Sequence, residues 1–288
     1  MATLEATGPN AEQIQYWNEL AGPKWVAVHS LIEAQIRPLG LMAMDRAGIA
    51  AGERVLDVGC GCGNTTIEIA QRFGPTGRAV GIDVSAVMLG QARQLARDTG
   101  MDQVHFELAD AQTHTFPPAS FDAVYSRFGV MFFAHPDAAF ANLCRAVRPG
   151  GRLAFVCWQA LQNNPWMHVP LMAALQHIPP PAPPAPDAPG PFAFAEPERV
   201  HGILTRAGFA GVGFESVEQP LSIGGGSDLD QAVDLLLQMG PAAHALREAG
   251  AEATPAVRAA VREALAPFHT PRGVQMPSAA WIVTARRR

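Results

Sequence analysis

Short apolar segments alternate with amphipathic segments between residues 54 and 158, and glycine, proline or polar residues separate them. The apolar segments predict strands at 54–57, 78–83, 103–108, 121–126 and 152–158. In most of the intervening segments, apolar residues recur every three or four positions and glycine or proline follows, which is typical of helices. Strands that alternate with helices predict a parallel sheet with crossover helices.

Further elements flank this alternating region. Strands at 212–219 and 279–285 complete a predicted α/β fold with a doubly wound, seven-stranded, mostly parallel sheet of the Rossmann-like kind. Ahead of the sheet, Asn10 and Gln13 have the spacing of a capping box, which predicts the start of a first helix, and 24–36 is a second helix. More helices are expected at 165–178, at 196–207 and within an insertion.

These elements divide the chain into three predicted parts. Residues 1–48 form an N-terminal helical cap, and residues 49–160 form the ligand-binding core. Residues 161–288 hold the remaining strands, a proline-rich connector at 179–191 and a helical lid at 228–267.

The most informative segment is Val-Leu-Asp-Val-Gly-Cys-Gly-Cys-Gly-Asn at 55–64, where a strand runs into glycines at alternate positions. Gly59, Gly61 and Gly63 permit a tight turn with positive φ and remove the Cβ atoms that would hold a ligand away from the backbone. Asn64 is expected to cap the next helix. The segment predicts a loop that binds a nucleotide-type cofactor.

Asp57 indicates which cofactor this loop binds. In a dinucleotide-binding loop the pyrophosphate lies against the helix N-terminus, where a fixed anion before the first glycine is unfavourable. At 4 Å and an effective dielectric constant near 20, a carboxylate gains about 4 kcal/mol opposite an ammonium group and loses as much opposite a phosphate. The spacing is also G-x-G-x-G and not G-x-G-x-x-G. Both features favour S-adenosylmethionine, whose ammonium and sulfonium groups are cationic.

Two more acids end the next two predicted strands. Asp83 is the last residue of the second strand, where a carboxylate can accept hydrogen bonds from both ribose hydroxyls. Asp110 follows the third strand, where it can accept from the exocyclic amine of adenine, although a turn or capping role is the alternative. Together with Asp57, these acids lie at the carboxyl edge of the sheet, where such folds bind ligands.

The chain resembles class I S-adenosylmethionine-dependent methyltransferases and is similar to the group that acts in quinone and natural-product biosynthesis. The resemblance rests on segments 55–63, 81–85, 109–111, 116–117 with 120–122, 126–133 and 147–151. It implies a cofactor site made by Trp17, Asp57, Gly59, Gly61, Asp83, Val84, Met88, Asp110, Ala111 and Ser126. Within that site it implies that Ser126 offers its carbonyl oxygen to the cofactor ammonium and that Trp17 belongs to an N-terminal lid. It also implies that the final strand is antiparallel.

Methyl transfer requires a protein that excludes water and aligns the acceptor with the S–CH₃ bond. The candidate acceptor-binding residues are apolar, although each is also suited to core packing: Met131, Phe132, Phe133, Trp158, Trp166 and Met239. His135, His29 and His168 are candidate general bases. Arg127 either holds an anionic substrate or pairs with a lid carboxylate. The expected acceptor is a small hydrophobic or aromatic molecule, and its accepting atom (O, N, S or C) stays open.

Composition and charge limit the kinds of molecule that the protein is expected to bind. A net charge of −5 and a pI near 6 argue against a nucleic-acid surface. Since the sequence has neither a membrane-spanning apolar segment nor a secretory signal, no membrane partner and a cytoplasmic location are expected. Cys60 and Cys62 have no second ligand pair at zinc-site spacing, so no metal is expected. A homodimer is left open.

Two alternative functions stay open from the sequence. One is an NAD-dependent oxidoreductase, because an acid at the end of the second strand also occurs in dinucleotide-binding folds. The other is a non-catalytic regulatory protein that binds S-adenosylmethionine, because the catalytic part of the site has no motif of its own.

Overall fold

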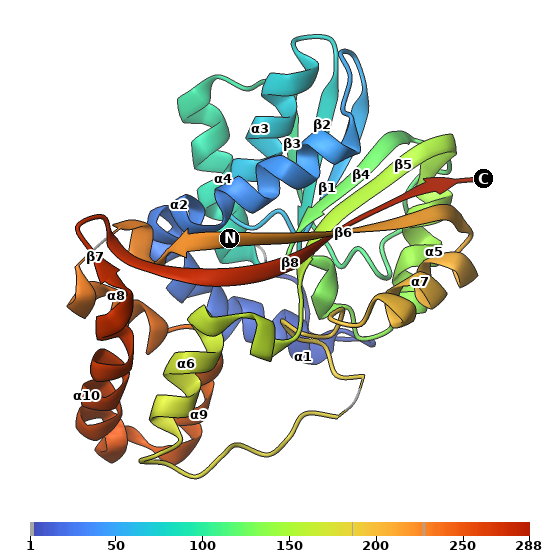
Figure 1. The fold of residues 1–288 in the computed structure, drawn as a ribbon. Helices are drawn as coiled ribbons and strands as arrows, with labels where there is room; N and C mark the ends of the chain where they lie inside the picture. Colours follow the sequence, from blue (N-terminus) through green and yellow to red (C-terminus); the bar gives the residue numbers. More distant parts are fainter. Residues whose placement is uncertain (1–2, 186, 227) are drawn as a thin grey trace.

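The structure is a computed structural model that describes residues 3–185, 187–226 and 228–288. Its main strands are β1 (Arg54–Val58), β2 (Arg78–Asp83), β3 (Val104–Leu108), β4 (Phe121–Arg127), β5 (Val147–Trp158), β6 (Phe209–Ser222) and β8 (Gly273–Arg287). They pair in the order β3-β2-β1-β4-β5-β8-β6, and a short strand β7 (His269–Thr270) pairs with β8. All main strands are parallel except β8, which is antiparallel to both of its neighbours. The predicted sheet is confirmed (Figure 1).

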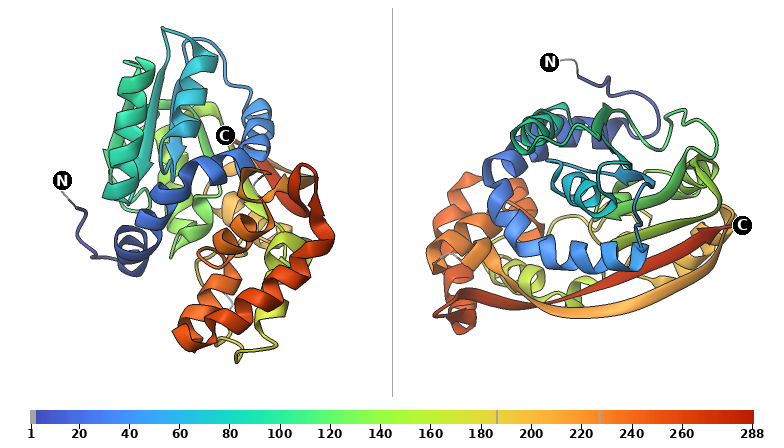
Figure 2. Two further views of the ribbon diagram at one scale, coloured as in Figure 1. Left: turned by 90° about the vertical axis from the view of Figure 1, so that its left-hand side faces the viewer. Right: turned by 90° about the horizontal axis from the view of Figure 1, so that it is seen from above.

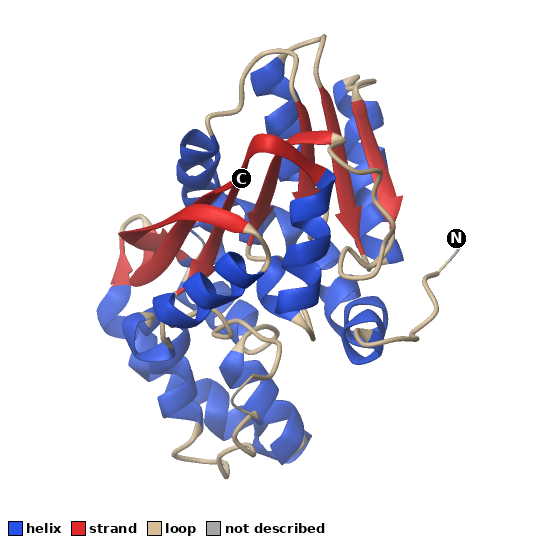
Figure 3. Ribbon diagram, turned by 90° about the vertical axis from the view of Figure 1, so that its right-hand side faces the viewer, coloured by secondary structure: helices blue, strands red, loops and turns tan. Residues whose placement is uncertain are grey.

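Helices cover both faces of this sheet (Figure 3). The helices that connect the parallel strands and flank β6 are α3 (Asn64–Phe73), α4 (Ala86–Thr99), α5 (Pro136–Ala146) and α7 (Pro197–Arg206). The central strand β1 is buried from Val55 to Val58, since a parallel strand with helices on both sides contacts no water. This double coverage explains why the strands read as continuous apolar runs.

The N-terminal cap consists of α1 (Ala11–Gln15), a π-helical turn at Tyr16–Leu20 and the long helix α2 (Ala21–Ala47). The predicted end of the second helix at residue 36 is wrong, because α2 continues through Pro38. Beyond the proline, Leu39, Ala43 and Met44 are fully buried at helical spacing. Their burial outweighs the hydrogen bond that the proline removes.

Two predicted helix caps are also wrong. Asn10 stands at the start of α1, but its side chain makes no capping hydrogen bond because its amide contacts the core instead. Asn64 is the first residue of α3, and the capping position belongs to Gly63 at φ 87°. Ser85, in contrast, caps α4, with its Oγ accepting from the Met88 N–H at 3.4 Å.

A helical lobe extends from the sheet on one side (Figures 1 and 2). It comprises α6 (Pro165–Ala174), α8 (Leu229–Leu236), α9 (Pro241–Ala249) and α10 (Thr254–Leu265). The insertion between β6 and β8 is helical, as predicted, and α9 and α10 pack against α6. In the connector, residues 179–185 form no helix or strand.

Candidate active site

The strand order reverses between β1 and β4, so the crevice at their carboxyl ends is the expected ligand site of this fold. The glycine loop lies there, with Gly59 and Gly61 at φ 67° and 55°. A Cβ on Gly59 would lie 2.7 Å from the Cα of Gly129, and one on Gly61 would lie 2.9 Å from the Cε of Met88. These glycines therefore let neighbouring parts of the protein pack closely, in addition to permitting the turn.

Asp57 is completely buried at the end of β1. Its Oδ2 accepts hydrogen bonds from the hydroxyl groups of Thr65 and Thr66 at 2.6 and 2.7 Å, and both threonines lie in the first turn of α3. Its Oδ1 has no hydrogen-bond partner within the described chain. Burial raises the pKa of Asp57 from 3.8 to about 6, although the threonine hydroxyls and the charge of Arg127 oppose this rise.

Asp83 is half-buried at the end of β2 and holds the glycine loop in place. Its Oδ2 accepts from the Gly61 N–H at 2.8 Å, and its Oδ1 accepts from the Ser85 N–H at 2.8 Å. Burial raises the pKa of Asp83, and the backbone hydrogen bonds oppose the rise. Each oxygen keeps a second lone pair, so the carboxylate can still accept from a ligand.

Asp110 is buried just after β3. Its Oδ1 accepts from the Asn10 side-chain amide at 3.0 Å and from the Gln112 N–H at 2.9 Å. Its Oδ2 receives only the hydroxyl of Thr113 at 3.4 Å. The three acids thus lie at adjacent strand ends, as the sequence predicts.

The other predicted cofactor residues lie around the same edge. Ser126 is buried, and its Oγ donates to the Val58 carbonyl at 2.7 Å. The Trp17 carbonyl accepts from the Ser85 hydroxyl at 2.8 Å, which brings the cap against the β2–α4 turn. The Val84 carbonyl accepts from Asn18 at 2.9 Å. Ala111 and Met88 are buried beside these elements.

Arg127 pairs with the cap. Its guanidinium forms two hydrogen bonds with the Glu33 carboxylate of α2, at 2.8 and 2.5 Å. Burial lowers the pKa of Arg127, but the hydrogen bonds and charge of Glu33 outweigh burial and raise this pKa overall. Gly40 permits the close approach, because a Cβ there would lie 2.6 Å from the Arg127 Cδ. Of the two roles left open for Arg127, the structure shows the ion pair.

Aromatic side chains gather at the ends of β4 and β5. Phe128 has a positive φ of 57°, which is rare for a bulky residue, and its ring stacks on Trp158 with centroids 4.0 Å apart. Trp158 contacts Trp166 of α6 at 5.2 Å. On the cap side, Trp17 meets Phe132 edge-to-face at 5.1 Å. Two aromatic groups therefore flank the edge that carries the acids.

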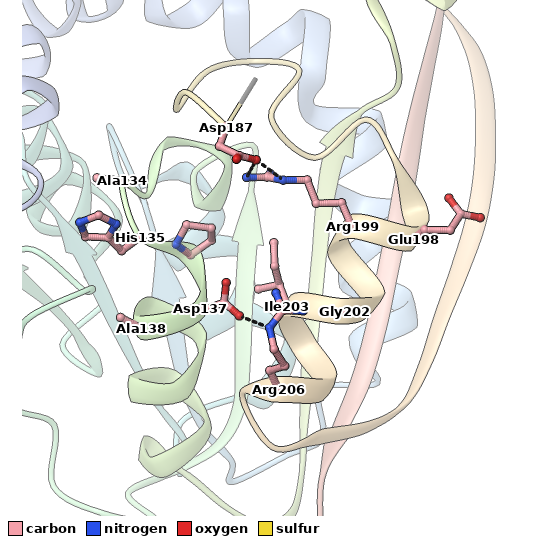
Figure 4. A pocket seen from close by; sticks show the side chains of 11 residues that line it. Ala134, His135, Asp137, Ala138, Asp187, Glu198, Arg199, Gly202, Ile203 and Arg206 are labelled. Atoms are coloured by element: carbon pink, nitrogen blue, oxygen red, sulfur yellow. Dashed lines mark hydrogen bonds and ion pairs between the residues drawn. The ribbon is translucent and has the colours of Figure 1, made fainter. Parts of the chain in front are cut away.

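The candidate bases are not brought together. His29 is half-buried on α2, and His168 is half-buried on α6. His135 is exposed and borders a hollow of about 620 Å³ between the start of α5 and the length of α7. In this hollow Asp137 faces Arg206, and Asp187 faces Arg199 (Figure 4). None of the three site acids lines it, so His135 borders a different surface from their carboxylates.

No group of three or more His, Cys, Asp or Glu side chains in the described ranges could hold a metal ion. Burial raises the pKa of Cys60 and raises the pKa of Cys62 to about 12, so both thiols stay protonated at neutral pH. Within the part of the chain that the structure describes, no helix is both long and apolar enough to cross a bilayer.

Several residues that shape the site were not predicted. Thr65 and Thr66 hold Asp57, Asn10 contacts Asp110, Asn18 ties the cap to Val84, and Glu33 pairs with Arg127. The threonine pair had a local signal, because hydroxyl side chains in the first turn after a glycine loop point back toward the preceding strand end. The other contacts join residues more than 60 positions apart and have no local signal.

Comparison with known proteins identifies the class. Residues 55–151 match the family model described as a methyltransferase domain, and this range contains all three acids. The predicted class, S-adenosylmethionine-dependent methyltransferase, is thereby confirmed for this domain, and S-adenosylmethionine is the cofactor of that class. The match goes against the NAD-dependent oxidoreductase.

Particular relatives agree with this class. The chain is 36% identical over 118 residues to aklanonic acid methyltransferase DauC of Streptomyces sp. (strain C5), covering 41% of this chain and 54% of that protein. It is 38% identical over 122 residues to ubiquinone/menaquinone biosynthesis C-methyltransferase UbiE of Pseudomonas aeruginosa (strain LESB58), covering 42% and 48%. The chain therefore spans about half the length of the curated relatives it matches.

Solved structures share the fold. The YcgJ protein of Bacillus subtilis aligns with a TM-score of 0.57 at 18% identity, over 87% of this chain and 97% of that one. Phosphoethanolamine N-methyltransferase 2 of Haemonchus contortus, in complex with S-adenosyl-L-methionine, aligns with a TM-score of 0.53 at 18% identity, over 87% and 52%. At these identities the likeness concerns the fold alone.

Proposed function

We propose that the protein transfers a methyl group from S-adenosylmethionine to a small hydrophobic or aromatic acceptor by direct displacement. The observation that carries this proposal is the unpartnered Oδ1 of the buried Asp57. A buried carboxylate oxygen without a donor is costly, and its raised pKa expresses that cost. A cationic ammonium group next to it would recover the lost interaction.

The remaining acids suit the rest of the cofactor. Asp83 would accept from the ribose hydroxyls through its free lone pairs while it holds the Gly61 N–H. Asp110, beside Ala111, would accept a hydrogen bond from the exocyclic amine of adenine. The Ser126 carbonyl would accept a further hydrogen from the ammonium group. When bound, the sulfonium supplies an activated methyl group, so the chain's task is to bind, orient and exclude water.

The two aromatic groups support the proposal of a hydrophobic or aromatic methyl acceptor. Phe128, Trp158 and Trp166 form one continuous set, and Trp17 with Phe132 forms another. Such rings stack favourably on flat apolar molecules and keep water from the reacting atoms. They therefore favour a hydrophobic or aromatic acceptor over a charged one.

The proton released by an acceptor hydroxyl or amine needs a base. In this proposal the general base is His29 or His135, and ligand binding brings its side chain to the carboxyl edge of the sheet. Arg127 acts instead as a positioning residue, because its hydrogen bonds to Glu33 hold α2 against β4.

Two measurements test the function. Titration calorimetry should detect binding of S-adenosylmethionine and S-adenosylhomocysteine and no binding of NADH. Methyl-labelled S-adenosylmethionine incubated with phenols, amines and thiols should then yield labelled product from at least one apolar acceptor. Cofactor binding with no transfer to any acceptor would favour the non-catalytic alternative, and binding of NADH alone would refute the proposal.

A further inference from the structure

Asn10 makes a buried contact that its place near the chain start does not explain. Its side chain is only 4% exposed, and both ends of its amide are hydrogen-bonded. The Nδ2 donates to the Asp110 Oδ1 at 3.0 Å, and the Oδ1 accepts from the Ala134 N–H at 2.8 Å. The orientation of this amide is unambiguous, because a carboxylate needs a donor and a backbone N–H needs an acceptor.

As a result of this contact, the two carboxylate oxygens of Asp110 differ in their hydrogen bonds. Oδ1 already has two good donors, from Asn10 and from the Gln112 N–H at 2.9 Å. Oδ2 has only the Thr113 hydroxyl at 3.4 Å, which is long for a hydrogen bond. Asn10 therefore fixes the rotation of the carboxylate and leaves one oxygen available.

We propose that Asn10 is a positioning residue for cofactor recognition. It orients Asp110 so that Oδ2 accepts a hydrogen bond from the exocyclic amine of adenine. The inference rests on the proposed function, in which Asp110 contacts adenine. A hydrogen bond to a carboxylate depends steeply on geometry, so an acceptor held in one rotamer binds the amine more tightly than one that rotates. Asn10 thereby links the N-terminal cap to the proposed adenine contact through one side chain.

Asn18 provides a matched control. Its amide ties the same cap to the core in the same two-ended way, because Nδ2 donates to the Val84 carbonyl at 2.9 Å and Oδ1 accepts from the Ala86 N–H at 3.0 Å. Nδ2 also donates to the Ile14 carbonyl inside the cap at 2.8 Å, and none of the partners of Asn18 is Asp110. Loosening the cap at Asn18 therefore leaves the donors to Asp110 in place.

The test uses the full chain and two probes in titration calorimetry. One probe is S-adenosylhomocysteine, and the other is its 6-deamino analogue, in which hydrogen replaces the exocyclic amine. A charge-assisted hydrogen bond predicts that the natural protein prefers the amine by about 10-fold to 100-fold. In Asn10→Ala this preference should fall to about threefold or less, whereas Asn18→Ala should keep the full preference even if both affinities fall.

The outcomes separate this inference from the cofactor assignment. Failure of the natural protein to bind S-adenosylhomocysteine would refute the assignment itself. Equal binding of the two probes by the natural protein, an unchanged preference in Asn10→Ala, or tighter binding by that variant would overturn the inference alone. Thermal unfolding identifies variants that do not fold, and Asn10→Ser, which keeps a small polar group, replaces Asn10→Ala in that case with the same expected loss of preference.

Discussion

The residues proposed to bind the cofactor and those proposed to bind the acceptor share one edge of the sheet, but different interactions hold these two halves of the site. In the cofactor half, each acid has fixed donors: Asp57 has the hydroxyls of Thr65 and Thr66, and Asp83 has the N–H groups of Gly61 and Ser85. These contacts are directional, so few side chains satisfy them.

The acceptor half is held mainly by apolar contact. Phe128 stacks on Trp158, and Trp158 contacts Trp166 of the helical lobe. Apolar packing tolerates exchange among side chains of similar volume. The methyltransferase family model matches residues 55–151, which contain the three acids, and ends before Trp158 and α6. Cofactor chemistry is therefore visible in motifs, whereas acceptor choice depends on shape.

The largest expected effect is that of Asp83→Ala on cofactor binding. The change removes an acceptor for the ribose hydroxyls and also frees the N–H groups of Gly61 and Ser85, so the glycine loop loosens. We expect S-adenosylhomocysteine to bind at least about 100-fold more weakly and the free energy of unfolding to fall by about 1–3 kcal/mol.

Asp122→Ala is the control for that substitution. Asp122 also accepts from a backbone N–H, that of Arg54 at 2.8 Å, but it lies at the start of β4, at the opposite end of the strands. It should lower stability and leave cofactor affinity unchanged. Equal loss of affinity in both variants would show that Asp83 acts through stability alone.

Asp57→Asn should separate stability from binding through pH. The folded pKa of Asp57 lies at about 6, above its ordinary value of 3.8, so the protonated form is favoured in the folded state. The contribution of Asp57 to the free energy of unfolding is therefore greatest below pH 3.8 and is lost as pH rises through 6, by about 3 kcal/mol in all.

Asp57→Asn has no charge at residue 57 and therefore does not lose this free energy of unfolding as pH rises. At pH 8 we expect Asp57→Asn to unfold about 5 °C higher than the natural protein, yet to bind S-adenosylhomocysteine at least about 10-fold more weakly. Near pH 4 the difference in stability should vanish. Thermal and denaturant unfolding across this range provide the measurement, and a variant that is less stable at pH 8 would contradict the burial argument.

Trp166→Leu is the corresponding probe of the acceptor half. Loss of one ring should raise the KM for an apolar acceptor by about 10-fold, since aromatic contacts contribute about 0.5–1.5 kcal/mol beyond area burial. The affinity for S-adenosylhomocysteine should stay within about twofold of the natural value, because Trp166 contacts none of the acids.

Phe194→Leu provides the comparison for Trp166. Phe194 is fully buried among Phe140 and Phe155, away from the aromatic set that contains Trp166. It should reduce stability and leave the acceptor KM unchanged. A cofactor affinity that falls together with the acceptor affinity in Trp166→Leu would show that the two halves are not independent.

The same contrast determines what the sequence could predict. The bounds of β2 match the prediction at 78–83, because an apolar run between polar and glycine-containing segments marks each end locally. The acids were found for the same reason: Asp57 and Asp83 close their strands, and Asp110 comes just after its strand.

Contacts between distant segments could not be predicted in this way. Asn10 meets Asp110 across 100 positions, and Glu33 meets Arg127 across 94. Such pairs form only where the N-terminal cap packs against the sheet. The position of α2 depends on apolar residues that stay buried beyond Pro38. Local patterns show neither the path of α2 nor its partners, so Asn10 was interpreted as a helix cap.

The smallest expected effect concerns backbone strain. Ala119 and Phe128 are the two described residues other than glycine with positive φ, at 54° and 57°. Ala119 lies in the turn before β4, so Ala119→Gly should relieve strain and stabilise the protein by about 0.5–1 kcal/mol after the greater flexibility of the unfolded chain is counted. Cofactor and acceptor binding should not change.

Phe128→Gly relieves similar strain but removes the ring that stacks on Trp158 at 4.0 Å. Truncation of a buried phenylalanine costs about 3–5 kcal/mol, so this variant should be less stable than the natural protein and should bind apolar acceptors more weakly. Thermal unfolding of both variants gives the comparison. Opposite signs would indicate that the strained backbone at Phe128 persists because packing of its ring stabilises the fold, whereas a gain in stability in both would mean that the ring contributes little there.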